Sequence, residues 1–273
     1  MNGGTGDRTL APFGRRRARV VGRDQHGAYV VLRCLDPAGP RPQAGQFYML
    51  ATASRWGGGE ADRPFLPRAF SVLRAPRGTD ELHFLIEDVG PGTKRLCESE
   101  PGGELLLVGP LGRGFEPPEG ERQALLVGGG VGIAPLAIWQ EQLDRPPAAT
   151  LLGFRDAPRA AGAQLLHGAH VATDDGSVGH HGFVTDLLRE ELDEQGDSVT
   201  VFACGPPPML EAVRALAASH LAPAQLALES GMACGFGACF GCVVPTKRGY
   251  LRLCVDGPVL DAGALELVGG AGH

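Results

Sequence analysis

The chain has 273 residues, of which 43% are hydrophobic and 21% are charged, and its formal net charge is −6. This length allows two or three domains, and the composition is that of an ordinary globular protein. The negative charge gives no support for nucleic-acid binding, and neither a membrane-spanning run nor a signal peptide is recognisable. We therefore expect a cytoplasmic protein that binds neither nucleic acid nor membrane.

The first part of the chain predicts an antiparallel barrel. Residues 1–14 are rich in Gly and polar side chains and predict a disordered tail. Residues 15–118 then contain short apolar segments separated by Gly and Pro turns, a pattern typical of a small β-barrel. The expected strands lie at 28–35, 46–51, 82–87 and 104–108, with a loop at 52–64.

From residue 119 to 222 strands alternate with helices. The expected strands lie at 123–127, 149–154, 170–173 and 199–203, and the expected helices at 133–143, 184–192 and 208–220. Such alternation predicts a parallel sheet. A third unit, residues 223–273, is expected to begin with a strand at 225–229 and to continue into a cysteine-rich loop. The predicted fold class is thus α+β with three domains.

Four cysteines in this last unit have a distinctive spacing. Cys234, Cys239 and Cys242 form a C-x4-C-x2-C pattern, and Cys254 follows after a gap. This is the plant-type spacing of a [2Fe–2S] cluster, and the intervening glycines allow a loop to close around it. A structural zinc site in a non-catalytic scaffold is the alternative, although zinc ligands usually come as two close pairs. The other cysteines, Cys34, Cys97 and Cys204, are expected to be buried free thiols.

A glycine-rich turn joins the predicted strand at 123–127 to the helix at 133–143. Its glycines would let a pyrophosphate approach the backbone N–H groups at the helix N-terminus. A plain strand-to-helix turn is the alternative, because the strict G-x-G-x-x-G spacing is absent. The candidate residues are Gly128, Gly129, Gly130 and Gly132.

Two further segments follow predicted strands of the parallel sheet. Thr173, Asp174 and Asp175 offer carboxylates that can bind the ribose hydroxyls of NAD and would repel the 2′-phosphate of NADP. No Arg or Lys lies within residues 173–179 to bind that phosphate, so we expect NAD(H) to be preferred. An ordinary Asp-Gly turn is the alternative. The second segment, residues 204–206, is either another cofactor contact or a rigid connector containing a buried cysteine.

The barrel region carries two candidate contacts for a flavin dinucleotide. Arg68, Ala69, Phe70 and Ser71 combine a guanidinium for phosphate, an apolar surface and a polar contact near the flavin ring. Gly92 and Thr93 stand at the expected start of a helix, where N–H groups could bind a second phosphate. The alternatives are an ordinary strand and a simple turn.

In this order, the motifs resemble those of the ferredoxin–NADP reductase superfamily. Within it, the chain is most similar to the electron-transfer subunits of NAD-dependent, class 1B dihydroorotate dehydrogenases. The resemblance covers nearly the whole chain after residue 15, and its most specific part is the cluster stretch. The matching pieces lie at 68–71, 92–93, 109–112, 128–135, 173–177, 182–185, 204–209, 229–234 and 253–260.

The resemblance implies an electron relay. FAD would lie on the barrel and NAD on the parallel sheet, with Cys204, Gly205 and Pro206 among the cofactor contacts. The cluster would face a separate FMN-containing catalytic subunit, in a heterotetramer of two plus two chains. Electrons from the oxidation of dihydroorotate, a step of pyrimidine (UMP) biosynthesis, would pass through FMN, the cluster and FAD to NAD+. The alternative is a related reductase subunit of a hydrogenase or of a ferredoxin:NADP transhydrogenase.

The chain departs from the expected family pattern at Ile86 and Glu87. An aromatic and a basic residue are expected before the Gly-Thr motif, and a carboxylate does not bind phosphate directly. The resemblance therefore implies that only the backbone of Leu85, Ile86 and Glu87 lines the flavin.

Overall fold

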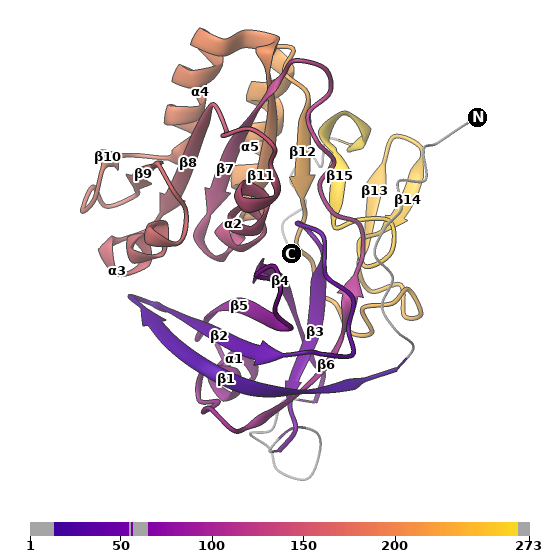
Figure 1. The fold of residues 1–273 in the computed structure, drawn as a ribbon. Helices are drawn as coiled ribbons and strands as arrows, with labels where there is room; N and C mark the ends of the chain where they lie inside the picture. The colour runs from indigo at the N-terminus through magenta and orange to yellow at the C-terminus, as the bar shows by residue number, and fades with distance from the viewer. Residues whose placement is uncertain (1–13, 55, 57–64, 267–273) are drawn as a thin grey trace.

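The computed structural model describes residues 14–54, 56 and 65–266. The expected disordered tail, apart from Gly14, and most of the expected loop at 52–64 lie outside these residues. Figure 1 shows a barrel below a sheet covered by helices, with the last strands along one side. In the described part of the chain, no helix is both long and apolar enough to span a bilayer.

The N-terminal half forms a closed antiparallel barrel, as the sequence predicts, with six strands where ranges for four were expected. All neighbouring strands are antiparallel, in the order β1-β2-β5-β4-β3-β6. Fully buried side chains such as Leu32, Tyr48 and Phe84 occupy its interior. The strands are β1 (Arg16–His26), β2 (Tyr29–Leu35), β3 (Phe47–Thr52), β4 (Arg68–Arg74), β5 (Glu81–Glu87) and β6 (Glu104–Leu111), and helix α1 (Pro91–Cys97) connects the last two.

The second half is built on a seven-stranded sheet with the order β10-β9-β8-β7-β11-β12-β15. Only the pairing of β12 with β15 is antiparallel. In chain order, its strands are β7 (Gln123–Gly129), β8 (Ala149–Phe154), β9 (Ala169–Thr173), β10 (His180–His181), β11 (Val199–Cys204), β12 (Ala224–Ala227) and β15 (Val259–Asp261). The helices are α2 (Ile133–Gln142), α3 (Ala157–Ala160), α4 (Val184–Gln195) and α5 (Pro207–Ser219), with short 3-10 turns at Gly130–Gly132, Ala161–Leu165, Gly196–Ser198 and Ala262–Ala264.

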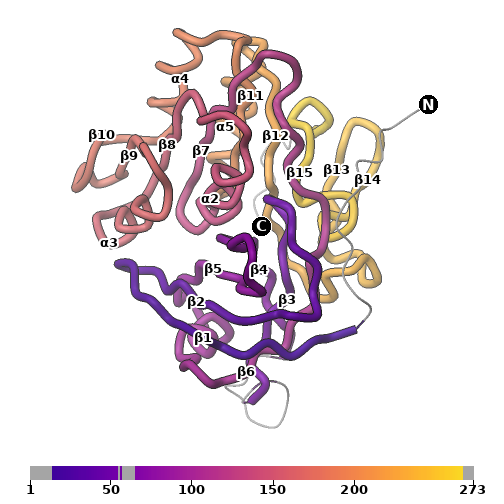
Figure 2. Tube along the Cα trace, viewed as in Figure 1, coloured from indigo at the N-terminus to yellow at the C-terminus, as the bar shows by residue number. Residues whose placement is uncertain are grey.

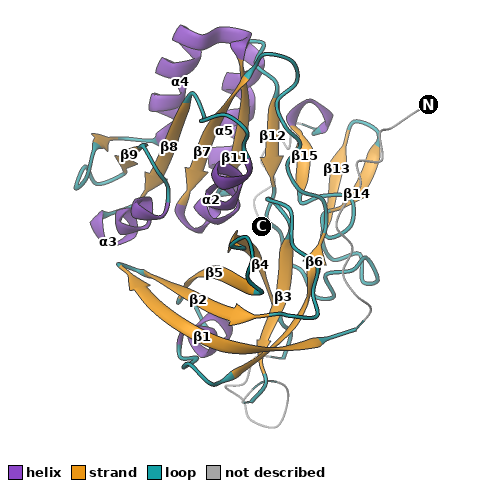
Figure 3. Cartoon of the chain, viewed as in Figure 1, coloured by secondary structure: helices purple, strands orange, loops and turns teal. Residues whose placement is uncertain are grey.

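Helices cover both faces of this sheet (Figure 3). Alternate strand residues point to opposite faces. Leu126 and Phe202 pack on the α2 side, whereas Leu125 and Val201 pack on the side of α4 and α5. The α2 face is also the face that meets the barrel, because the same buried cluster continues into Tyr48 and Phe84.

The cysteine-rich segment is less separate than the sequence suggests. The strand expected at 225–229 is β12, and it belongs to the central sheet because it pairs with β11. β15 (Val259–Asp261) returns to the same sheet. Among the described residues of this segment, the hairpin of β13 (Val243–Thr246) and β14 (Gly249–Arg252) alone forms a separate sheet. The three-domain division at 118/119 and 222/223 stays a prediction.

The barrel and the sheet meet across α2. Trp139 on this helix packs against Phe115 and Phe202, with ring centroids 5.8 and 5.3 Å away. The Arg74 guanidinium of β4 is 2.5 Å from a carboxylate oxygen of Glu141. At the other end of the interface, the β1–β2 turn reaches α3, where Ala28 N–H donates to the Pro158 carbonyl at 2.9 Å (Figure 2). This interface places two neighbouring cavities between barrel and sheet.

Candidate functional site

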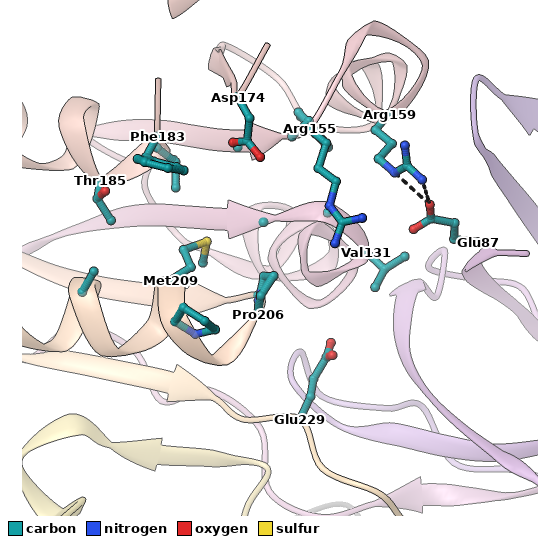
Figure 4. Close-up of a pocket in the computed structure, with 18 of the residues that line it drawn as sticks. Glu87, Val131, Arg155, Arg159, Asp174, Phe183, Thr185, Pro206, Met209 and Glu229 are labelled. Atoms are coloured by element: carbon teal, nitrogen blue, oxygen red, sulfur yellow. Dashed lines mark hydrogen bonds and ion pairs between the residues drawn. The ribbon is translucent and has the colours of Figure 1, made fainter. Parts of the chain in front are cut away.

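The larger cavity has a volume of about 620 Å³ and lies at the carboxyl ends of β7, β8, β9 and β11. Ligands of open α/β sheets bind at this edge. Of the residues predicted to bind the nicotinamide dinucleotide, Gly129, Gly130, Asp174, Gly205 and Pro206 line it. Asp174 and Pro206 are seen facing the cavity in Figure 4.

The remaining predicted glycines have packing roles. A Cβ on Gly132 would lie 2.4 Å from the Cys204 carbonyl oxygen, so only glycine fits where the turn crosses the end of β11. A Cβ on Gly128 would lie 3.0 Å from Leu136 and Leu152. Gly130 has a φ of +55°, and a Cβ there would meet nothing. The turn is therefore tight on its inner side and open toward the cavity.

The acidic turn after β9 separates its residues into different roles. Thr173 is buried, and its hydroxyl donates to the Val178 carbonyl at 2.9 Å and accepts from Val178 N–H at 3.1 Å. Asp175 accepts from Ser177 N–H at 2.9 Å, and hydrogen bonds with Ser177 lower the pKa of this carboxyl. Asp174 alone of these three lines the cavity. Asp175 and Thr173 thus hold the turn that presents Asp174.

Cys204 lies beneath the cavity. It is 1% exposed, and burial, with a contribution from the charge of Glu229, raises the pKa of its thiol well above the ordinary value. Its neighbours Gly205 and Pro206 line the cavity and Cys204 does not, so Cys204 supports the cavity wall from below.

The smaller cavity has a volume of about 240 Å³ and opens between β4, β5, α2 and the chain after β12. It is below the roughly 300–1,000 Å³ of common ligand pockets, so it accommodates only part of a dinucleotide. The residues predicted to contact flavin that line it are Ala69, Phe70, Ser71, Leu85, Glu87 and Thr93. Ile86 points instead into the barrel and is fully buried.

The two expected phosphate contacts of the barrel are brought together. A Cβ on Gly92 would lie 2.8 Å from Nε of Arg68, so the guanidinium packs on the glycine backbone. The Thr93 hydroxyl accepts from the N–H groups of Val89 and Gly90 at 2.9 and 3.0 Å. Ser230, in the opposite wall, has a buried hydroxyl without a hydrogen-bond partner. A glycine-lined arginine and an unsatisfied buried hydroxyl at one cavity fit a polar, phosphate-bearing ring ligand such as FAD.

The two cavities share Glu87, Val89, Val131 and Glu229. Glu229 is accessible through both cavities yet closely surrounded by protein, and this desolvation raises the pKa of its carboxyl. Glu87 accepts from Nε of Arg159 at 2.9 Å, and Nη1 of Arg159 contacts Asp156 at 2.5 Å. The carboxylate that departs from the expected flavin pattern is therefore paired across the interface with an arginine of α3.

The four predicted cluster cysteines lie in and beside the loop that follows β12. All are free thiols; Cys242 and Cys254 are buried, and their sulfur atoms are 3.2 Å apart. Cys239 is exposed, and Gly241 N–H donates to its sulfur at 3.4 Å. Among the described residues, no three His, Cys, Asp or Glu side chains converge on a site for a single ion. A [2Fe–2S] cluster differs from such a site because it has two irons, each held by two ligands.

The cluster loop fits closely against its surroundings. Gly235 and Gly237 have φ values of +80° and +90°. A Cβ on Gly235 would lie 2.5 Å from Met49 of β3, and one on Gly237 would lie 2.7 Å from Val255. Burial raises the pKa of Cys234, but N–H groups of Cys239, Phe236 and Ala238 stabilise its thiolate and lower the pKa to about 6. Thiolate-stabilising N–H groups and left-handed glycines fit an iron–sulfur cluster.

Comparison with known proteins identifies the family. Residues 229–266 match the model described as the iron–sulfur cluster binding domain of dihydroorotate dehydrogenase B. The dihydroorotate dehydrogenase B (NAD(+)) electron transfer subunit of Caldanaerobacter subterraneus is 35% identical over 251 residues, covering 90% of this chain and 96% of the relative. That of Geobacillus thermodenitrificans is 38% identical over 242 residues, covering 82% and 87%.

The chain belongs to the family of dihydroorotate dehydrogenase B electron transfer subunits. This confirms the family predicted from the motifs, and with it an oxidoreductase subunit that transfers electrons. A solved NADH-dependent reduced ferredoxin–NADP oxidoreductase has the same fold, with a TM-score of 0.76, 24% identity and coverage of 93% and 91% of the two chains. A ferredoxin NADP+ reductase from Neisseria gonorrhoeae, solved with FAD and NADP, has a TM-score of 0.59, 20% identity and coverage of 76% and 91%. The predicted fold class, an antiparallel barrel joined to a parallel sheet with helices and a C-terminal iron–sulfur binding segment, is confirmed.

Several lining residues of the larger cavity were not foreseen from the sequence. Arg155 follows the end of β8, Phe183 precedes α4, and Glu229 follows β12. The position of Arg155 at the carboxyl end of a parallel strand was a usable signal. Glu229 and Phe183 lie within stretches that carry the family resemblance, but nothing in their spacing indicates a cavity.

Proposed function

We propose that this chain relays electrons between an FMN-containing, dihydroorotate-oxidising subunit and NAD+ through a [2Fe–2S] cluster and FAD. The observation that carries the proposal is the path of residues 228–234. Leu228, Glu229, Ser230 and Met232 line the smaller cavity, and Cys234 follows after a single residue. A flavin site and the first cluster ligand are thus joined by a short segment.

The barrel residues are proposed to hold FAD. Arg68 and the α1 N-terminus at Gly92 and Thr93 would bind its phosphates, and Phe70 and Ser71 would contact the flavin. Bound FAD supplies the conversion between two-electron hydride transfer and single-electron transfer. The protein must then hold the nicotinamide and the cluster close to the flavin. The wall shared by the two cavities supports such an arrangement of FAD and NAD(H). Ala69 and the backbone of Leu85, Ile86 and Glu87 complete the proposed contacts.

The larger cavity is proposed to bind NAD(H). Its glycine turn, Gly128–Gly132, would hold the pyrophosphate at the N-terminus of α2. Asp174, rather than Asp175 or Thr173, would accept hydrogen bonds from the adenosine ribose. The segment Cys204–Pro206 would lie near the nicotinamide end, close to the smaller cavity, because Pro206 and Glu229 both line the larger one.

The thiolates of Cys234, Cys239, Cys242 and Cys254 are proposed as the ligands of the [2Fe–2S] cluster. The family name implies a dihydroorotate dehydrogenase catalytic partner. A heterotetramer of two plus two chains is the proposed assembly, and the cytoplasmic location expected from the sequence stays a prediction. A hydrogenase or transhydrogenase subunit is not better supported, since the similar ferredoxin–NADP oxidoreductase is only 24% identical and shows the fold alone.

Co-expression with the FMN-containing subunit encoded in the same genome tests the proposal. The two chains should co-purify with flavin and iron–sulfur absorption, and the complex should reduce NAD+ with dihydroorotate while neither chain does so alone. A chain loaded with both cofactors that forms no complex with the catalytic subunit would contradict the partner. A complex that transfers no electrons to NAD+ would contradict the relay.

A further inference from the structure

The larger cavity contains one arginine that the predicted contacts leave without a function. Its charged lining residues are Glu87, Arg155, Arg159, Asp174 and Glu229. Arg159 is already engaged by two carboxylates, Glu87 at 2.8 Å and Asp156 at 2.5 Å. In the described part of the chain, the Arg155 side chain has no hydrogen bond or ion pair, and the residue is exposed. Arg155 is therefore the only unpaired cation among the lining residues described.

The direction of the Arg155 side chain is informative. The residue directly follows β8, and its carbonyl accepts from Asp175 N–H at 3.2 Å, which places the ends of β8 and β9 side by side. Figure 4 shows that the two side chains nevertheless diverge. The carboxylate of Asp174 stays at the β9 end, whereas the guanidinium of Arg155 extends into the cavity toward Val131, beside the glycine turn.

This arrangement matches the charge pattern of a dinucleotide. Ribose hydroxyls are uncharged donors that suit Asp174, and the pyrophosphate carries the negative charge that suits a guanidinium. Gly129 and Gly130 line the cavity without a Cβ, so a pyrophosphate could approach the backbone of the glycine turn there. Without Arg155, the free charges of the cavity would be the carboxylates of Asp174 and Glu229, which repel an anion.

We propose that Arg155 is the side-chain ligand of the pyrophosphate of NAD(H), opposite the glycine turn. The inference rests on the proposed use of the larger cavity for NAD(H). In this assignment Arg155 provides affinity for the pyrophosphate of the dinucleotide. Asp174 provides the preference for NAD(H) over NADP(H) at the adenosine ribose. Arg159, one turn further along, keeps its role in the ion pair across the interface.

Equilibrium binding of ADP-ribose to the purified chain tests this assignment without requiring electron transfer. ADP-ribose contains the adenosine and pyrophosphate but no reacting nicotinamide. Arg155→Ala should raise its dissociation constant by about tenfold to a hundredfold, the loss expected for a charge-assisted contact. Arg155→Lys should keep part of the affinity, since a point charge remains. Arg145→Ala, which removes a surface arginine paired with Glu121, is the matched control and should change nothing.

The outcomes separate this inference from the proposed function. Unchanged ADP-ribose affinity in Arg155→Ala would overturn the inference alone. No binding of ADP-ribose by the unmodified chain would overturn the nucleotide cavity as well. A loss seen with 2′,5′-ADP but not with ADP-ribose would overturn the pyrophosphate assignment, because Arg155 would then bind a 2′-phosphate. In dye-reduction assays, KM for NADH should rise with the ADP-ribose dissociation constant while kcat changes little.

Discussion

Asp174 and Asp175 show how neighbouring residues of one type acquire different environments. The sequence leaves both open as ribose contacts, because backbone geometry decides which carboxylate turns back on its own loop. Asp175 accepts from Ser177 N–H at 2.9 Å, while Asp174 lines the larger cavity. The spacing of the residues also could not show that the Thr173 side chain folds back on its own loop. Its hydroxyl hydrogen-bonds to both the carbonyl and the N–H group of Val178.

At Asp174 we predict a change in nicotinamide preference. The unmodified chain should use NADH at least tenfold more efficiently than NADPH, since about 1.4 kcal/mol of repulsion at the 2′-phosphate is sufficient. Asp174→Ser should narrow this ratio, and Asp175→Ser, the matched control, should leave it nearly unchanged. Steady-state dye reduction with both cofactors measures the ratio. Equal kcat/KM for NADH and NADPH in the unmodified chain would contradict the prediction.

At Glu229 we predict a pH effect on stability. Desolvation raises the pKa of this carboxyl above its ordinary value of 4.5, so the native state binds more protons than the unfolded state just above that pH. The contribution of the protonated Glu229 carboxyl to the free energy of unfolding is therefore fully present below pH 4.5 and is lost as pH rises through the native pKa. Glu229→Gln should raise Tm relative to the unmodified chain near neutral pH but not below pH 4.5. A Tm difference that stays constant with pH would contradict this.

At the scale of elements, the cluster loop depends on an unusual backbone as much as on its cysteines. Gly235, Gly237 and Phe240 all have positive φ, at +80°, +90° and +58°. The loop rests on Met49 of the barrel and on Val255, so it is held by two other parts of the chain. The six barrel strands close on each other without the loop, and the barrel contributes Phe47, Met49 and Leu111 to the buried cluster that contains Cys242 and Cys254.

We therefore predict that loss of the cluster leaves the barrel intact. Cys239→Ser should remove or destabilise the [2Fe–2S] absorption and electron paramagnetic resonance signal, while FAD stays bound in stoichiometric amount. Cys97→Ala, a change at a buried thiol of α1 away from the loop, should retain the cluster and is the control. Intact cluster spectra after serine replacement at Cys239 and one other predicted ligand would contradict the four-cysteine assignment.

The sequence predicts elements with a strong apolar pattern and misses polar or short ones. No strand was expected at β1, which has 11 residues, because only Ala18, Val20 and Gly22 of it are buried. The strand at 123–127, its glycine turn and the helix at 133–143 agree with β7 and α2, because the glycines separate two apolar runs and the second run, buried from Ile133 to Trp139, ends in polar residues. β10 has two residues and β15 three, too few to show alternation. The place of β12 in the central sheet was also missed, since membership of a sheet is decided by distant partners.

At the scale of the whole molecule, function depends on how barrel and sheet face each other. Both cavities draw residues from β5 and from the chain around α2 and β12, so a change in the angle between the two parts would alter both sites together. The aromatic contact at Trp139 holds the interface at its centre, and the Glu87–Arg159 pair holds it beside the cavities. Glu87 thus gains a structural role where a flavin contact was expected of its position.

This role predicts measurable coupling between the two parts. A double-mutant cycle of Glu87→Gln and Arg159→Gln, measured by urea unfolding, should give a coupling energy of about 1 kcal/mol. This value is toward the upper end for partly exposed ion pairs, because the two side chains are only 19% and 29% exposed. The Arg17–Glu104 pair within the barrel, 66% and 49% exposed, is the control and should give a value near zero. Both single variants should also broaden the unfolding transition or split it into two, because the barrel and the sheet would then unfold less cooperatively. A coupling energy no larger than that of the control pair, with a single sharp transition, would show that the Glu87–Arg159 pair does not couple the two parts.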